Sequence, residues 1–576
     1  MSEAPLAELA LDDEQAAAVD SDDPAIAVLA GPGSGKTRVL SYRTRRLLGL
    51  DGSSRALLLT FTNKAAAEMK ARALGVANVT SDRISASTFH TFGLQVLHAH
   101  GDLLDVGRDF ETIDDQSRSS LSEEVARHAG TTDRYRRWSF LRLRRRTTRD
   151  QDLLRFGRAY EAAKREQHLV DFDDLIVCTA TLFEEHPEVA AAYAARYQHI
   201  LVDEFQDTNA AQFAIVRALA NTAKTVSVFA DDDQAIYRFA GAEAENVRRF
   251  LSELGATEFA LTVNYRCREA IVERANRLIA ADPNASGRRM RSFYAGGEVL
   301  LRVFPTMQAE AEQLVHEVAG LIDRQEVAAS EVAILARAAF RLQPLLVELE
   351  RSGTPVSNWL GVRYESEERR TLGTCLSVVR GAMTDRQVER FCTFLGIPET
   401  DERDPIALLE ANAEIPAALL LGEVRRLAWQ GASVGTIVRA AQTATAEVDP
   451  TLAASFDPIL ESIAAFERSD PEFSLEHFLS ELTLGGVGGA PTVGGGVKIA
   501  SLHRTKGLQW PHVYILGLEE GRLPDFRAET DDDLRDERRT CFVGVCRAER
   551  RLTLTRTQLY GRTTQTPSRF LSEMGF

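Results

Sequence analysis

The chain has 576 residues, of which 44% are hydrophobic and 26% are charged, a composition typical of a globular protein. At roughly 150 residues per domain, this length predicts about four domains. The formal net charge of −16 argues weakly against a nucleic-acid partner, although a local basic patch would overrule the sum. No apolar run approaches the roughly 18 residues of a membrane span, and the N-terminus is acidic where a signal peptide is basic. We therefore predict neither a membrane protein nor a secreted one.

The cysteine and lysine content narrows the kinds of protein and of site that the sequence can encode. The six cysteines include no C-x-x-C pair, which argues against a zinc or iron–sulfur site and predicts a reduced, cytoplasmic chain. Only seven residues are lysine, whereas 61 are arginine. Where arginine is the default cation, a lysine indicates a position that needs a compact ammonium group. Lys36, Lys64 and Lys506 fall within the motifs described below.

The first informative segment predicts a strand, a loop and a helix. An apolar run at 25–29 leads into Ala30-Gly31-Pro32-Gly33-Ser34-Gly35-Lys36-Thr37, and a helical pattern follows at 39–48. This matches the Walker A pattern with Ala30 in the first glycine position, because glycines let backbone N–H groups close around phosphate oxygens at a helix N-terminus. Lys36 would neutralise the β- and γ-phosphates of ATP, and Thr37 would bind Mg²⁺. The alternative is a glycine-rich turn before a helix.

Two later strands end in carboxylates. After a predicted strand at 57–61 and a helix at 65–74, the run 199–202 ends in Asp203 and Glu204, and the run 226–230 ends in Asp231-Asp232-Asp233-Gln234. Sheets of α/β proteins place their chemistry at the carboxyl ends of parallel strands. Asp203 can therefore hold Mg²⁺ while Glu204 faces an attacking water as general base. The order of elements predicts a parallel, doubly wound P-loop NTPase core.

Residues 95–195 are predicted to be mostly helical and include a basic segment. Between Arg134 and Arg149, eight arginines are interleaved with Tyr135, Trp138 and Phe140. Cations mixed with aromatic rings suit a phosphate backbone with stackable bases. The alternative is a solvated basic helix face.

A glycine-rich segment precedes the last part of the chain. Seven of the twelve residues 485–496 are glycine, which predicts a flexible hinge. Beyond it we expect strands at 497–502 and 513–516 and a helix–strand pair at about 534–555.

Nine motifs occur in one order along the chain. They are Leu11–Gln15 (the Q motif), the Walker A loop, Thr60–Met69 (Ia), Thr88–Phe92 (Ib), Val202–Asp207 (II), Asp231–Tyr237 (III), Asn264–Arg266 (IV), Leu502–Leu508 (V) and Arg538–Ala548 (VI). In this content and order the chain resembles the UvrD/PcrA/Rep-like family of superfamily 1A DNA helicases. The resemblance runs from about Leu11 to Phe570, which is nearly the whole length.

The resemblance implies an α/β fold of two RecA-like P-loop NTPase motor domains. Each domain would have a parallel, doubly wound sheet and carry a mostly helical insertion. The implied boundaries are 1–94 and 196–270 for the first motor domain, 95–195 for its insertion, 271–370 and 497–576 for the second motor domain, 371–484 for its shortened insertion, and 485–496 for the hinge.

The resemblance also assigns roles at an ATP site. Gln15 would read the adenine edge, Tyr265 would stack on the adenine face, and Gln234 would sense the γ-phosphate. Arg266 and Arg547 would reach that phosphate from the second motor domain as arginine fingers. The implied catalytic residues are Lys36, Asp203, Glu204, Gln234, Arg266 and Arg547, with Thr37 and Asp203 on the metal. The implied nucleotide-binding residues add Gln15, Ala30, Gly31, Pro32, Gly33, Ser34, Gly35, Arg38 and Tyr265.

A second set of residues would contact DNA by resemblance. Phe61, Tyr237 and Phe239 would stack on single-stranded bases, at about 1–3 kcal/mol per base. Core packing is the alternative for Phe61 and Tyr237, and a structural, hydrogen-bonded role is the alternative for the two histidines of the set. The full implied set is Phe61, Asn63, Lys64, His90, Tyr237, Phe239, His503 and Lys506.

The chain departs from the family pattern at two positions. Ala240 stands where family members carry an arginine that links the γ-phosphate to the DNA site, and the neighbouring Arg238 is the candidate substitute. Gln509 stands where a carboxylate is expected near the nucleotide sugar. Both departures lie on the coupling machinery, so we expect hydrolysis to survive and coupling to DNA to be the property affected.

The implied function is an ATP- and Mg²⁺-dependent single-stranded DNA translocase and 3′–5′ DNA helicase in repair, replication or recombination. Its partners would be single strands and single/double-strand junctions. One alternative is the motor subunit of a helicase–nuclease repair or phage-defence complex, with a protein partner bound through the shortened insertion. Another is a nucleotide-gated DNA sensor that hydrolyses ATP without productive unwinding.

Overall fold

The computed structural model describes most of the chain. The described residues are 10–77, 79–113, 115–238, 241–243, 245–283, 285–358, 366–379, 383, 385–469, 475, 478–479 and 495–576. Phe239, Ala240 and residues 485–494 of the expected hinge lie outside them.

The N-terminal half contains a six-stranded sheet in the order β3-β2-β6-β7-β1-β8. All pairings in it are parallel. Its central strands are continuous apolar runs because both faces of the sheet are covered by helices. The strands are β1 (Ala25–Ala30), β2 (Ala56–Thr60), β3 (Ile84–Thr88), β6 (His199–Val202), β7 (Thr225–Ala230) and β8 (Thr257–Leu261).

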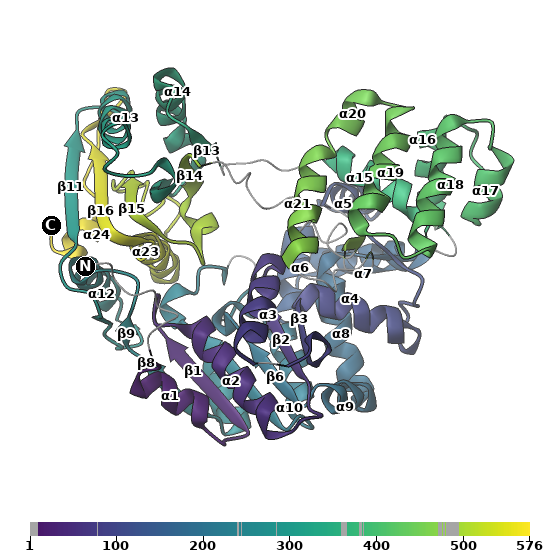
Figure 1. The fold of residues 1–576 in the computed structure, drawn as a ribbon, viewed down its shortest axis with the longest axis horizontal. Helices are drawn as coiled ribbons and strands as arrows, with labels where there is room; N and C mark the ends of the chain where they lie inside the picture. Colours follow the sequence, from purple (N-terminus) through teal and green to yellow (C-terminus); the bar gives the residue numbers. More distant parts are fainter. Residues whose placement is uncertain are drawn as a thin grey trace.

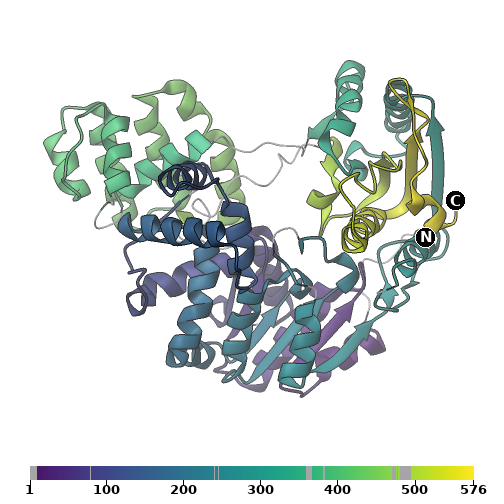
Figure 2. The same cartoon turned by 180° about the vertical axis from the view of Figure 1, so that it is seen from behind.

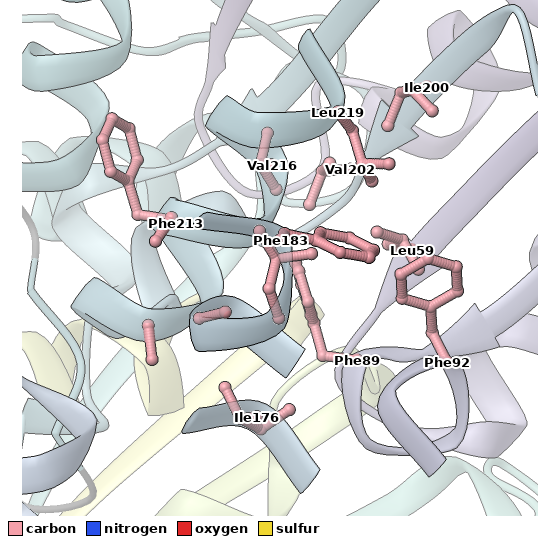
Figure 3. Close-up of a cluster of buried hydrophobic side chains, with 14 of the residues drawn as sticks. Leu59, Phe89, Phe92, Ile176, Phe183, Ile200, Val202, Phe213, Val216 and Leu219 are labelled. Atoms are coloured by element: carbon pink, nitrogen blue, oxygen red, sulfur yellow. The ribbon is translucent and has the colours of Figure 1, made fainter. Parts of the chain in front are cut away.

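Helices pack on both faces of this sheet. One face shares a buried cluster with α1 (Asp13–Asp20), α2 (Lys36–Leu50) and α3 (Asn63–Ala77). On the other face Phe89, Phe92 and Phe183 lie with Leu59 and Val202 of the strands in one buried cluster, which also includes Phe213 (Figure 3). The helices of that second face are α4 (Phe89–His100), α8 (Phe172–Glu185), α9 (Pro187–Arg196), α10 (Ala210–Ala220) and α11 (Glu245–Leu254).

The first insertion is smaller than the range 95–195 expected from the sequence. A separate cluster around Phe156 and Tyr160 joins α5 (Asp115–His128), α6 (Tyr135–Leu143) and α7 (Gln151–Glu166) beside the strand pair β4 (Glu111–Thr112) and β5 (Leu169–Val170). By contrast, α8 and α9 contribute to the core of the first sheet. We therefore place these two helices with the first motor domain, because the apolar residues that they bury pack on its sheet.

The C-terminal half contains a second six-stranded parallel sheet, in the order β11-β16-β15-β12-β14-β13. Its strands are β11 (Glu298–Phe304), β12 (Val332–Ala336), β13 (Val356–Asn358), β14 (Val497–Ser501), β15 (Trp510–Leu516) and β16 (Ala548–Thr557). One face is covered by α12 (Glu269–Ala280), α23 (Asp531–Val545) and α24 (Arg569–Met574), and the other by α13 (Met307–Asp323) and α14 (Gln343–Ser352). The expected fold of two α/β motor domains is confirmed.

Short strands complete the second motor domain. β9 (Val263–Asn264) pairs in parallel with β10 (Arg291–Ser292) between the two sheets, and β17 (Leu559–Tyr560) pairs antiparallel with β18 (Thr563–Thr564).

The second insertion is helical and has a core of its own. In both views its helices lie beside α5 to α7 of the first insertion and apart from the second sheet (Figure 1, Figure 2). Arg390 of the second insertion pairs with Glu111 of β4 at 3.1 Å. The helices are α15 (Ser366–Ser377), α16 (Asp385–Leu395), α17 (Pro405–Ala411), α18 (Pro416–Trp429), α19 (Val434–Ala446), α20 (Pro450–Ala454) and α21 (Asp457–Ser469). Within the described ranges no helix is both long and apolar enough to cross a membrane.

A buried histidine at the start of β6 gives the first prediction. His199 lies beside Thr225, with Nδ1 2.9 Å from Oγ1, and burial together with the charge of Lys224 lowers its pKa to about 4. Between pH 6.5 and 4 the unfolded chain therefore binds a proton at this residue that the folded chain does not, and stability falls as pH falls through that window. By pH 5 the loss is on the order of 2 kcal/mol.

Replacing this histidine should remove that pH dependence. His199→Gln has no titrating ring, so we expect its melting temperature, measured relative to wild type, to rise between pH 7 and pH 5. Thermal unfolding of both proteins at the two pH values measures this. The exposed His128 provides the control His128→Gln, for which the difference should stay constant. A constant difference for His199→Gln as well would contradict the prediction.

Candidate nucleotide site and DNA-facing residues

The phosphate-binding loop follows β1 and ends where α2 begins at Lys36. Gly33 and Gly35 have φ values of 71° and 85°, in the left-handed region that favours glycine. A Cβ added at Gly33 would lie 2.6 Å from Cβ of Arg266, and one at Gly35 would lie 2.8 Å from Nε2 of Gln15. Both glycines are therefore required by backbone conformation and by the close approach of side chains from the Q motif and motif IV.

The adenine-reading residues expected from the sequence lie against this loop. Gln15 is buried at the start of α1, where it forms a capping box with Asp12, and its Nε2 donates to the Ser34 carbonyl at 2.9 Å. The Tyr265 amide donates to the Gly33 carbonyl at 2.8 Å, and the Tyr265 hydroxyl donates to Asp12 at 2.5 Å. The structure thus brings Gln15 and Tyr265 to the same end of the loop.

The lysine of the phosphate-binding loop and the candidate general base form an ion pair. Lys36 Nζ lies 3.4 Å from Oε1 of Glu204. Burial acts to lower the pKa of Lys36, but the charges of Glu204, Asp203 and Asp231 outweigh it and raise that pKa. Burial likewise opposes the charge of Glu204, yet Lys36 and Lys506 hold the pKa of Glu204 well below its usual range. Glu204 is therefore ionised, as a general base must be.

The backbone at Glu204 turns its side chain away from that of Asp203. Glu204 has a φ of 53°, in the left-handed region, which is uncommon for a residue other than glycine. Its amide donates to Oδ1 of Asp203 at 2.9 Å, and its own carboxylate accepts from Gln206 Nε2 at 2.5 Å. Adjacent residues of motif II thus face different partners, as expected from the sequence.

Asp203 and Thr37 offer the oxygen ligands that Mg²⁺ prefers. Asp203 directly follows β6 and is buried, and burial together with the charge of Glu204 raises its pKa to about 6. A buried carboxylate of this kind is the environment that a divalent cation stabilises. Thr37 is the second residue of α2. The residues present fit a magnesium ion.

Two arginines lie where the two motor domains meet. Arg547 is buried, and its Nη2 donates to Oε1 of Gln234 at 3.0 Å, while burial and the charge of Arg266 lower its pKa to about 10. Gln234 in turn donates to Asp231 at 2.5 Å. Arg266 donates from Nη1 to the Cys546 carbonyl at 3.3 Å, and its buried Nε has no hydrogen-bond partner among the described residues.

The remaining expected loop residues also lie at this site. Ala30 is fully buried, and the Arg38 guanidinium lies 5.6 Å from the centre of the Tyr42 ring. The Pro32 carbonyl accepts from Asn264 at 2.7 Å. Ser34 donates from its hydroxyl to the Gly31 carbonyl at 2.7 Å, which closes the loop on itself.

Three further residues belong to the site although the sequence did not single them out. Besides holding Pro32, Asn264 accepts from the amides of Arg266 and Cys267, at 2.9 and 2.7 Å. Gln206 joins Glu204 to the amide of Asp231, which donates to Gln206 Oε1 at 2.8 Å. Asp207 accepts from Lys506. All three lie inside motifs II and IV, so their position within these motifs was the feature of the sequence that could have identified them as site residues.

Lys506 lies between the two motor domains. Besides contacting Asp207, its ammonium donates to the Gln234 carbonyl at 3.0 Å and lies 3.4 Å from Glu204. The same ammonium lies 5.4 Å from the centre of the Tyr237 ring. The structure places this expected DNA contact beside the nucleotide site, in contact with motif III.

The other expected DNA contacts fall into two groups. Half-buried Phe61, 6.2 Å from Phe89 by ring centres, lies with Asn63 and exposed Lys64 after β2. His90, after β3, packs edge-on to Phe172, and burial lowers its pKa to about 4. β2 and β3 are neighbours, so these side chains share one edge of the first sheet.

The second group comes from motifs III and V. Tyr237 lies under Lys506, and His503 lies in the turn Leu502–Thr505, where burial and the charge of Arg337 lower its pKa to about 4. Phe239 lies outside the described residues.

Several arginines of the segment 134–149 form ion pairs with carboxylates of the protein itself. Arg142 contacts Asp174, Arg145 lies 2.5 Å from Glu184, and Arg144 and Arg146 each lie 3.3 Å from Glu243. Trp138 donates to Glu161 at 2.9 Å rather than offering its indole N–H to solvent. The structure therefore pairs Arg142 and Arg144 inside the protein, whereas Arg145 and Arg146 stay on the exposed surface.

Arg238 does not take the place of the missing arginine at the nucleotide. Its guanidinium turns to the start of α23, with Nε 2.5 Å from Asp536 and Nη2 2.5 Å from Asp533. The expectation that Arg238 substitutes at the γ-phosphate is therefore wrong for this structure, because the two carboxylates hold it.

Comparisons with known proteins agree with this arrangement. The profile of the UvrD/REP helicase N-terminal domain matches residues 11–254, and that of the UvrD-like helicase C-terminal domain matches residues 451–558. The ATP-dependent DNA helicase PcrA of Staphylococcus epidermidis is 30% identical over 628 residues, covering 98% of this chain and 86% of the relative. The PcrA of Staphylococcus aureus is 28% identical, covering 97% of this chain and 86% of the relative. From the motif order, the paired parallel sheets and these relatives, the chain belongs to the UvrD/PcrA-like family of superfamily 1A DNA helicases.

Proposed function

We propose that this protein is an ATP-driven motor that moves along single-stranded DNA from 3′ to 5′ and separates duplex at single/double-strand junctions. Its place would be DNA repair, replication or recombination in the cytoplasm. The observation that carries the proposal is the contact of Arg547, from the second motor domain, with Gln234 of the first. This contact makes completion of the catalytic site and closure of the two domains a single event.

The residues of the site have distinct chemical roles in this proposal. Lys36 neutralises charge on the β- and γ-phosphates of ATP, and Glu204 accepts the proton of the attacking water. Gln234, Arg266 and Arg547 stabilise the transferring phosphoryl group. Thr37 and Asp203 would hold Mg²⁺, which supplies further positive charge to the phosphates.

The DNA side of the proposal rests on the two residue groups described above. Phe61 and Tyr237 would stack on bases, with Asn63, Lys64, His90, Phe239 and His503 as further contacts. Lys506 joins the ring of Tyr237 to the carboxylate of Glu204. A shift of the motif III loop on DNA binding would therefore reach the general base through a single lysine.

A protein partner for the second insertion is a separate part of the proposal. Leu419 and Trp429 on α18 are 66% and 75% exposed, and they are the candidate apolar contacts for such a partner.

Two assays of the purified chain test the function. We expect ATP hydrolysis to rise at least tenfold with saturating single-stranded DNA, and we expect strand separation on a duplex with a 3′ single-stranded tail but not on one with a 5′ tail. A rate of ATP hydrolysis that is the same with and without DNA would contradict the proposal of a DNA-driven motor. DNA-stimulated hydrolysis without strand separation would instead support the nucleotide-gated sensor.

A further inference from the structure

A short segment of motif III is held to the second motor domain at two points. Gln234 accepts from Arg547, which follows the C-terminal end of α23. Four residues later, Arg238 donates to Asp536 and Asp533 in the first two turns of the same helix. The motif III loop of the first domain therefore contacts both ends of α23 in the second domain.

The contact at the start of α23 crosses the boundary between the two motor domains. Ser286 and Arg288 of the second domain add contacts beside it, at 2.9 Å to Asp233 and 3.5 Å to Asp232. A rigid helix of 15 residues, about 22 Å long at 1.5 Å per residue, connects this contact to the arginine finger.

The energetics indicate orientation rather than stability. The side chains of Arg238, Asp533 and Asp536 are 39%, 38% and 25% exposed. Ion pairs with this exposure contribute only about 0–1 kcal/mol to folding. Two carboxylates one helical turn apart, each 2.5 Å from a different nitrogen of one guanidinium, nevertheless hold the start of α23 against the motif III loop, while the buried face of α23 sets its rotation on the second sheet.

We propose that Arg238 is a positioning residue, which by holding Asp533 and Asp536 sets the position of α23 against the motif III loop and so presents Arg547 to the nucleotide. The inference rests on the proposed function, since it assigns Arg547 as an arginine finger. It also gives motif III a connection to the catalytic site in a chain whose residue 240 is alanine.

The test compares Arg238→Gln, Asp533→Asn/Asp536→Asn and the combined triple variant. We expect kcat for ATP to fall about tenfold in each, with KM for ATP within twofold of wild type, because Arg238 faces the carboxylates of α23 rather than the phosphate-binding loop. The triple variant should be no slower than Arg238→Gln, since both changes break the same contact. Arg238→Lys, which keeps one charged donor, should recover part of the loss.

Arg248→Gln is the matched control, because exposed Arg248 pairs with Glu245 of its own helix, at 3.2 Å. Its kcat should stay within twofold of wild type. Four results would overturn the proposal: an unchanged kcat in Arg238→Gln, losses that multiply in the triple variant, a KM that rises as kcat falls, or an equal loss in the control.

Hydrogen exchange gives a readout that needs no turnover. With a non-hydrolysable ATP analogue bound, we expect faster exchange over 531–545 in Arg238→Gln than in wild type, and no difference in Arg248→Gln. A wild type whose hydrolysis ignores DNA counts against the proposed function, whereas equal exchange in wild type and Arg238→Gln counts against the positioning role alone.

Discussion

Glu204→Gln is expected to lower DNA-stimulated ATP hydrolysis by about 10²- to 10⁴-fold, the contribution typical of a positioned general base. Lys36 and Lys506 hold Glu204 in its ionised form, and the amide of glutamine has the same shape but accepts no proton. Affinity for ATP should change by less than threefold, because the loop and Gln15 are untouched. Steady-state kinetics and the binding of a fluorescent ATP analogue measure the two properties.

The matched control for this variant is Glu245→Gln. Glu245 is 62% exposed at the start of α11 and pairs with Arg248, away from the loop. It should hydrolyse ATP at the wild-type rate. If Glu204→Gln kept more than a tenth of that rate, another group would have to be the base.

Arg547→Ala is expected to lower kcat by about 10³-fold or more, as the loss of an arginine finger does in other phosphoryl-transfer enzymes. Its guanidinium donates to Gln234 of the first domain. The change therefore removes both the positive charge and the hydrogen bond that joins the two motor domains at this site. KM for ATP should change far less than kcat, because the charge acts on the transferring phosphoryl group. Steady-state kinetics with saturating DNA test this.

Folding must be separated from chemistry in that experiment, because Arg547 also donates to the carbonyls of Val543 and Leu508, at 2.8 and 2.9 Å. Arg547→Lys keeps a charge but cannot form the same set of contacts, and we expect it to be slow while melting within a few degrees of wild type. Arg562→Ala, at an exposed position between β17 and β18, is the control. A kcat within tenfold of wild type in Arg547→Lys would argue against a specific role for the guanidinium.

Local patterns predicted the motor core because each of its parts is encoded in a short stretch of sequence. The apolar run 25–29, the glycines and Lys36 form a strand, a left-handed loop and a helix start within a few residues of each other. Asp203 and Glu204 follow a run that can only be a buried strand. The resemblance to the helicase family then identified Arg266 and Arg547. No local sequence pattern shows that these arginines lie close to the phosphate-binding loop or to Gln234.

Long-range pairing explains what could not be predicted. Arg238 and Asp533 are 295 residues apart, and nothing in either segment shows that they meet. The basic segment 134–149 reads as a surface, but its carboxylate partners come from α8 and from Glu243. The extent of the first insertion was likewise hidden, because the apolar face of α8 looks the same in sequence whichever core it joins.

The tight contacts at the phosphate-binding loop limit which residues positions 33 and 35 can hold. Where Gly33 faces Arg266 and Gly35 faces Gln15, the space left over is narrower than a methyl group. A side chain at position 33 would push Arg266 away from the loop, and one at position 35 would displace the amide of Gln15. The two glycines therefore set how closely the motif IV arginine and the Q-motif glutamine can approach the loop that is expected to hold the phosphates.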